Sequence, residues 1–154
     1  KKNHKKYSSL RSVNLTSENS YKTFTISNHK LRTLISNSFN IEKVLRVYDG
    51  DTFAVNLHCP GNKNKKIKHL ICKNIRIRPT GFNAPEINSA DVDVKISAFA
   101  SRDYLRAVIK ESGKIKLKNV KRGKYFRLIA DVYIDNVPLS LIMIESGHAV
   151  PFDK

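Results

Sequence analysis

The sequence contains no tryptophan, a single methionine and two cysteines, and its 13 acidic residues are outnumbered by 29 lysines and arginines. No apolar stretch is long and uncharged enough to predict a membrane-spanning helix. The cysteines, Cys59 and Cys72, form no CxxC motif and no paired Cys/His spacing, which argues against a zinc site. They lie in neighbouring parts of one expected hairpin. Two unpaired thiols are the favoured interpretation, and a cross-strand disulfide is the alternative.

The excess of positive charge restricts the class of partner. The 154 residues suffice for one domain with a modest core, and their formal net charge is +16. Repulsion of this size opposes compaction and is typical of proteins that bind a polyanion. We therefore expect a nucleic acid as the partner first and an acidic membrane surface second.

Two segments are notably basic. Residues 1–40 are rich in Lys, Ser, Asn and Thr, with Glu18 as their only acid. They predict a basic N-terminal extension that is either solvated or in contact with nucleic acid or another partner. A short helix is expected within residues 28–39. The loop at residues 58–69 contains four lysines and is either a solvated face or a basic flap over a bound strand.

A hairpin is expected between the apolar runs at residues 42–48 and 52–57. The dipeptide Asp49–Gly50 predicts a tight turn in which the glycine takes a positive φ, so Asp49 is interpreted as a turn residue. Alternation places Asp51 at the end of the buried face of the second run. A carboxylate at that position needs a metal, an arginine or water as its partner. The buried face consists of Phe53, Val55 and Leu57.

The remaining pattern predicts three more strands and two helices. The strands are expected within residues 69–78, 114–120 and 125–134, and the helices at about 94–111 and 137–147. The first helix is expected to bury a stripe formed by Ile96, Phe99, Ala100, Tyr104, Ala107 and Val108. A helix inserted after the third of five short strands suits a small closed barrel of the OB type.

Three segments carry a resemblance to a known family. They are "VYDGDTF" (residues 47–53), "IRIRPTGFNAPEI" (residues 75–87) and "KYFRLIADVYI" (residues 124–134). In this order they resemble the motifs of the staphylococcal nuclease-like (thermonuclease) family, and the similarity extends over residues 41–152. The resemblance implies a β-barrel-dominated α+β fold for residues 41–154, namely a five-stranded OB-fold barrel with two to three helices. It also implies a calcium-dependent phosphodiesterase that acts on DNA and RNA.

The resemblance implies roles for single residues, carried over by position. Arg78, Glu86 and Arg127 match the family's catalytic residues. Lys124 and Tyr125 match family residues near the nucleotide phosphate.

Three further positions match the family's metal site. Asp51 matches a metal-binding carboxylate, Ala84 would offer its backbone carbonyl, and Asn83 stands where the family usually has a second aspartate. An amide oxygen can still bind calcium, but one negative charge is lost. We therefore expect one weakly bound calcium ion.

The chemistry of phosphodiester cleavage accounts for these residue types without appeal to the family. A water must be oriented or deprotonated, which suits Glu86, and charge on the phosphoryl oxygens must be balanced. Arg78 and Arg127 offer planar, permanently charged forks for those oxygens. A cation held by Asp51 would add Lewis-acid stabilisation.

The leading hypothesis is therefore a thermonuclease-like hydrolase, a calcium-dependent nuclease of DNA and/or RNA. The alternative is a catalytically weak or inactive nucleic-acid-binding module on the same fold, which Asn83 and the high net charge keep open. A protein-interaction scaffold is a third and more distant reading. Single-stranded nucleic acid is the expected partner and a monomer the expected state, and the sequence indicates no compartment.

Overall fold

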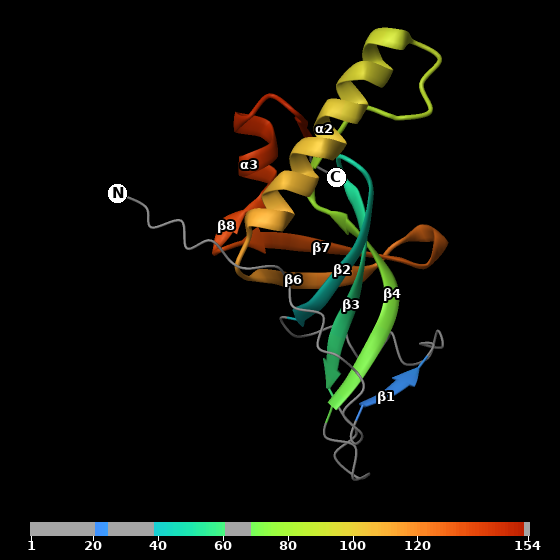
Figure 1. Ribbon diagram of the computed structural model, residues 1–154, viewed down its shortest axis with the longest axis vertical. Coiled ribbons are helices and arrows are strands. Elements are labelled where there is room, and N and C mark those ends of the chain that lie inside the picture. The colour runs from blue at the N-terminus through green and yellow to red at the C-terminus, as the bar shows by residue number, and fades with distance from the viewer. Residues whose placement is uncertain (1–20, 25–38, 61–68, 153–154) are drawn as a thin grey trace.

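The computed structural model describes residues 21–24, 39–60 and 69–152, and five of its strands form a closed barrel (Figure 1). The barrel strands are β2 (Phe39–Asp49), β3 (Thr52–Pro60), β4 (His69–Pro79), β6 (Ile115–Arg122) and β7 (Arg127–Ile134). Antiparallel pairs join β3 to β2 and β4, and β6 to β2 and β7. A parallel pairing of β4 with β7 closes the ring. The predicted barrel-dominated α+β fold is confirmed, and the OB type stays a prediction.

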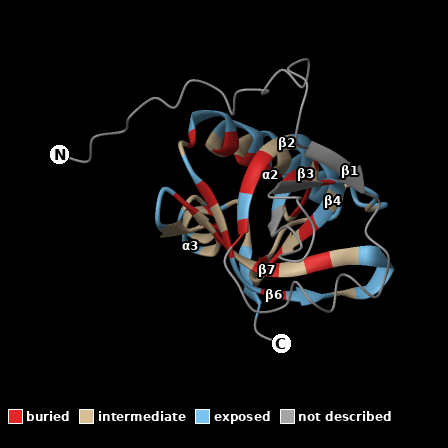
Figure 2. Ribbon diagram, turned by 90° about the horizontal axis from the view of Figure 1, so that it is seen from below, coloured by how far each residue is buried: buried red, intermediate tan, exposed pale blue. Residues whose placement is uncertain are grey.

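Alternate side chains of the strands fill the barrel. On β3 the predicted inner face of Phe53, Val55 and Leu57 is buried. The burial of these side chains is the main favourable term in the folding of a small barrel. Figure 2 shows buried and less buried positions alternating along the barrel strands. The inner positions of β6 and β7 include Ile115, Leu117, Leu128, Ala130, Val132 and Ile134.

Strand β4 departs from simple alternation. Alternation would place Cys72 on the face opposite Ile77, but both side chains are buried. The cause is a bulge, because Asn74 has a positive φ of 54° and the register of β4 with β3 shifts beside it. The Asn74 N–H donates to Asn56 Oδ1 at 3.2 Å. Cys72 is disulfide-bonded, so the favoured interpretation of unpaired thiols is wrong, and Cys59 is the only other cysteine.

Helix α2 (Val92–Glu111) packs on the barrel through a different face from the one expected. Ile96 is 62% exposed and Phe99 is 39% exposed, and Ala100 and Ala107 are exposed too, so the predicted stripe is wrong at these four positions. The helix instead buries two small residues and two large apolar ones. Figure 1 shows the N-terminal half of α2 projecting past the end of the barrel. The buried residues of α2 are Ala98, Ser101, Leu105 and Ile109.

The ends of both helices follow the sequence signals. The Asp91 carboxylate accepts hydrogen bonds from the Asp93 and Val94 N–H groups, which is the usual arrangement of a helix N-cap. Helix α3 (Leu139–Glu145) begins after Pro138 and is followed by Gly147, which has a φ of +77°. No helix within the described residues is long and apolar enough to cross a membrane.

Short elements complete the described structure. A parallel strand from the N-terminal extension lies beside β4, and a separate two-stranded sheet joins the chain after β4 to the C-terminal segment. The helix expected within residues 28–39 and the lysines of the loop lie largely outside the described residues. The short elements are β1 (Tyr21–Phe24), β5 (Gly81–Asn83), η1 (Lys124–Phe126), β8 (Val137–Pro138) and β9 (Val150–Phe152).

Candidate functional site

The turn between β2 and β3 presents Asp51. Asp49 Oδ1 accepts a hydrogen bond of 3.0 Å from the Asp51 N–H, so Asp49 has the turn role expected of it. Gly50 does not have the expected positive φ. It is required for a different reason, since a Cβ at this position would lie 1.9 Å from Ser101 Oγ and 2.6 Å from Ala84 Cβ. The turn is therefore wedged between α2 and the segment after β5.

The Asp51 carboxylate is largely buried and paired with an arginine. Its side chain is 13% exposed, and Oδ2 lies 3.1 Å from Arg78 Nη2. The same oxygen accepts a 2.8 Å hydrogen bond from the Ala84 N–H. Burial is the largest influence on this group and raises the pKa of Asp51 to about 6, against the opposing effects of the Ala84 N–H and Arg78. Of the three partners considered from the sequence, the arginine is the one present here.

Arg78 connects the turn to the end of β4 and to β5. Its Nη1 donates to the carbonyl oxygens of Pro79 at 3.1 Å and Phe82 at 3.2 Å. Its Nη2 donates to Asn83 Oδ1 in addition to the contact with Asp51. The guanidinium is thus occupied by the protein at both terminal nitrogens, and within the described residues only Nε has no acceptor.

The donor set around Asp51 fits a weakly held hard cation. Asp51 and Asn83 both direct a side-chain oxygen at the Arg78 guanidinium, so the two oxygens converge on one cationic position. Oxygen donors of this kind suit calcium, which takes six to eight such ligands. Two side chains supply a minority of that number. Within the described residues, no group of three His, Cys, Asp or Glu side chains is placed to hold a metal.

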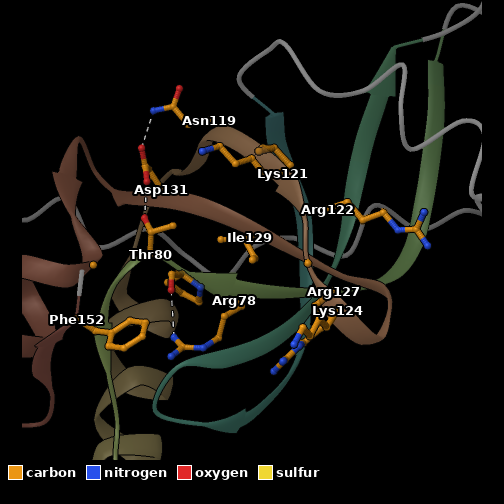
Figure 3. Close-up of a pocket in the computed structure, with 14 residues that line it drawn as sticks. Arg78, Thr80, Asn119, Lys121, Arg122, Lys124, Arg127, Ile129, Asp131 and Phe152 are labelled. Atoms are coloured by element: carbon orange, nitrogen blue, oxygen red, sulfur yellow. Dashed lines mark hydrogen bonds between the residues drawn. The ribbon is translucent and has the colours of Figure 1, made fainter. Parts of the chain in front are cut away.

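A pocket of about 950 Å³ lies beside β7, between the C-terminal ends of β4 and β6 (Figure 3). Arg78 and Arg127 both line it, and their strands are direct neighbours in the parallel pair that closes the barrel. Within the described residues, the Arg127 guanidinium makes no hydrogen bond or ion pair, so its five N–H donors remain available. The other basic residues of the lining are Lys121, Arg122 and Lys124.

The single acid in the pocket lining is already engaged. Asp131 accepts hydrogen bonds from the Thr80 hydroxyl and from Asn119 Nδ2, the latter at 2.6 Å. Figure 3 shows the Thr80 and Asn119 side chains on either side of Asp131. The carboxylate is thus held by two other residues of the pocket lining. Of the five basic residues in the lining, Arg78 is paired with Asp51, and the other four have no acidic partner within the described residues.

The connection between β6 and β7 holds two aromatic residues in an unusual conformation. The sequence predicts a strand at Tyr125 and Phe126, but both have positive φ, 55° and 57°. Both are also exposed, at 79% and 70%. The Arg127 Cζ lies 5.8 Å from the centroid of the Tyr125 ring. The structure therefore places Arg127 beside the exposed Tyr125 ring, and the substrate-binding role of Tyr125 and Lys124 stays a prediction.

Glu86 stands apart from this cluster. It is exposed, it does not line the pocket, and its side chain makes no hydrogen bond or ion pair with any described residue. It follows Ala84 by two residues, and the Ala84 N–H is bonded to Asp51. Glu86 therefore lies close in the sequence to a residue bonded to Asp51 but outside the pocket lining, and its catalytic role stays a prediction.

Other residues of the region divide into packing and binding groups. The His148 ring stacks on Tyr104 with centroids 4.4 Å apart, which is a packing contact. Lys121, Arg122 and Phe126 belong to the site but were not singled out in the sequence. The density of basic residues around the conspicuous segment "KRGKYFR" is the signal that points to them.

Comparison with known proteins adds no family assignment. The sequence matches no protein-family model, and no curated protein matches it.

Proposed function

We propose that this protein binds nucleic acid over β4 and β7 and hydrolyses its phosphodiester bonds, as a calcium-dependent nuclease of DNA and/or RNA. The observation that carries the proposal is the pocket where Arg78 and Arg127 meet three further basic residues, while its one acid is hydrogen-bonded to Thr80 and Asn119. The motif resemblance to the staphylococcal nuclease-like family and the barrel architecture are consistent with it.

Arg127 is the main phosphate ligand in this proposal. Its planar fork matches two phosphoryl oxygens, and no described residue competes for its donors. Lys124 adds a point charge from the same connection. Arg78 contributes its Nε–H and its positive charge while its terminal nitrogens hold the site together. These groups stabilise the charge that develops on the phosphoryl oxygens during cleavage.

Glu86 is the proposed water-activating group. In the step itself, a water oxygen bonds to phosphorus and the phosphorus–oxygen bond to the leaving oxygen breaks. The attacking water gives a proton to Glu86, and the leaving oxygen takes a proton from solvent. The exposed Glu86 carboxylate has no competing partner among the described residues, so it is free to orient that water. Asp51, Asn83 and the Ala84 carbonyl would hold the calcium ion, which supplies Lewis-acid stabilisation when bound.

A second candidate is a catalytically weak or inactive nucleic-acid-binding module. It is favoured by one specific observation: Arg78 already occupies the oxygens of Asp51 and Asn83 that a cation would need. In that case the pocket binds the strand without cleaving it. The two candidates share a substrate and differ only in turnover.

Incubation of the full chain with a labelled single-stranded oligonucleotide in calcium, magnesium or EDTA tests the proposal. Cleavage in calcium by the parent and by Glu111→Gln, an exposed control on α2, together with loss of cleavage in Glu86→Gln, supports the nuclease. Binding without cleavage under all conditions supports the second candidate. The absence of binding overturns both.

The calcium requirement is tested by Asn83→Asp. The carboxylate restores one negative charge to the ligand set, so half-maximal cleavage should need less calcium than in the parent. A calcium titration of activity for both forms measures this. If the two titrations superimpose, Asn83 is not a ligand.

A further inference from the structure

The tip of the connection between β6 and β7 carries two exposed aromatic rings side by side in the sequence. Phe126 and Tyr125 are 70% and 79% exposed, the two largest values among the exposed large hydrophobic residues of the described chain. Large aromatic side chains contribute most to stability when they are buried. Their exposure here contributes little to the fold and suggests a contact with something outside it.

The backbone holds both rings in place at an energetic cost. Tyr125 and Phe126 are consecutive bulky residues in the left-handed region, which such residues rarely adopt. The Gly123 N–H donates to the Arg127 carbonyl at 2.8 Å, and the Arg127 N–H donates to Lys124, so the connection is closed at its base. Strain retained by surrounding structure is typical of binding sites.

Each ring has an arginine beside it. Arg122 Cζ lies 5.8 Å from the centroid of the Phe126 ring, and Arg127 Cζ lies at the same distance from that of Tyr125. Neither arginine has an acidic partner within the described residues. The tip therefore combines open π-faces with uncompensated positive charge, the pairing by which proteins bind unpaired nucleotides.

We propose that Phe126, with Tyr125, stacks on unpaired bases of the strand whose phosphate lies at Arg127, and that the site is thereby selective for single-stranded nucleic acid. This rests on the proposed function and names its substrate class. A duplex keeps the faces of its bases inside its own stack, so it offers phosphates to this site but no free base face. Stacking therefore distinguishes a single strand from a duplex, whereas attraction to the phosphate charge alone does not.

A row of arginines next to the tip is placed to contact the phosphates of the same nucleic-acid strand. In register across the barrel, Arg127 on β7 lies beside Arg76 on β4, and Ala54 on β3 separates Arg76 from Arg46 on β2. Arg46 and Arg76 both lie over the Tyr48 ring, at 5.0 and 5.1 Å. The row has no acidic partner within the described residues. It supplies phosphate contacts that do not depend on the bases.

The test uses the full chain in EDTA, so that binding is measured without cleavage. One probe is a fluorescent oligothymidylate of about 12 nucleotides, and a second is the same backbone with abasic sites. Phe126→Ala should weaken binding of the first probe about tenfold and hardly change binding of the second. Phe126→Tyr, which keeps a ring, should restore the affinity.

Phe99→Ala is the matched control. Phe99 also has an arginine over its ring, at 4.8 Å, but it lies on α2 outside the pocket, so its loss should leave both affinities unchanged. Arg76→Ala should weaken both probes equally and reduce the slope of log affinity against log salt by about 1. Equal affinities of the parent and Phe126→Ala for the first probe overturn the stacking proposal while the proposed function stands. A parent that binds neither probe overturns both.

Discussion

Arg78 and Arg127 are chemically identical, lie on neighbouring strands and line one pocket, yet their surroundings are opposite. The terminal nitrogens of Arg78 contact the side chains of Asp51 and Asn83 and donate to three backbone carbonyl oxygens. Arg127 has no hydrogen-bond acceptor within the described residues and borders a strained, exposed connection. The difference teaches that neighbouring strands can hold one arginine in a network of protein contacts and leave the other with donors that no described residue uses.

The physical cause of this difference is the position of each residue relative to the turn between β2 and β3. Arg78 meets a buried carboxylate whose desolvation is partly offset by a fixed cation. Arg127 lines the open pocket, and its guanidinium makes no hydrogen bond or ion pair within the described residues. We therefore expect Arg78 to contribute mainly to the stability of the site, and we propose that Arg127 contributes mainly to binding and catalysis.

The largest expected effect is on catalysis at the open side. Arg127→Ala should lower the cleavage rate on the order of 10³-fold, because an arginine that stabilises phosphoryl-transfer charge contributes at this scale. Thermal unfolding should change little, since within the described residues the guanidinium makes no hydrogen bond or ion pair and lies beside the exposed Tyr125 ring. Arg127→Lys keeps the charge and should recover only part of the rate, because it lacks the fork. Parent-like cleavage by Arg127→Ala would contradict its proposed role.

A pair of glycine substitutions compares the packing of the two regions. Gly50→Ala should destabilise the fold by about 3 kcal/mol, because its Cβ would overlap Ser101 and Ala84. Gly123→Ala, at the open connection, should cost less, since its closest contacts are the Ile129 side-chain tips at 2.9 and 3.0 Å, which can move. Urea unfolding of both variants measures the difference.

The Gly50 prediction also has a rescue. Ser101→Gly removes two of the three atoms that crowd the new Cβ, so the double variant should regain part of the lost stability. If the double variant is no more stable than the sum of the single changes predicts, the clash with α2 is not the cause.

Arg78→Ala tests the buried side directly. It should destabilise the fold by about 2–3 kcal/mol, because the buried Asp51 carboxylate loses its cation and several acceptors lose their donor. Arg127→Ala is the matched control and should leave unfolding unaltered. In a double-mutant cycle, Asp51→Asn should cost less in the Arg78→Ala background than in the parent. Strict additivity of the two changes would show that the pair does not interact.

The smallest expected effect is the pH dependence that Asp51 gives to stability. Its pKa is about 6 in the folded protein and 3.8 in the reference state, so the folded state binds more protons between these values. Stability therefore falls as the pH rises through this window, by about 2 kcal/mol from about pH 4 to about pH 6. Asp51→Asn should not show this loss, because asparagine does not titrate. If the difference in stability between the parent and Asp51→Asn stays constant between about pH 4 and about pH 6, the assignment to Asp51 is wrong.

Much of the fold was predictable because the barrel strands alternate between core and surface. The inner faces of β3, β6 and β7 follow period two, and Asp91 and Gly147 mark helix ends by local hydrogen bonding and backbone freedom. The predictions are wrong where tertiary contacts override the local sequence pattern. A bulge at Asn74 reverses the alternation in β4, and Gly50 lies against Ser101 on the face of α2 that is buried.

The sequence by itself determined the strand and helix order, the excess of positive charge and the residue types that suit phosphate chemistry, since these depend on composition and short-range periodicity. Only the tertiary structure decided that Arg78 is held by Asp51 and Asn83 while the Arg127 guanidinium makes no hydrogen bond or ion pair within the described residues, because partners distant in the chain meet only once the barrel closes. It also decided that Tyr125 and Phe126 leave the strand and stand exposed. Closure of the barrel and the short connection between β6 and β7 impose that geometry, which no local preference of bulky residues favours.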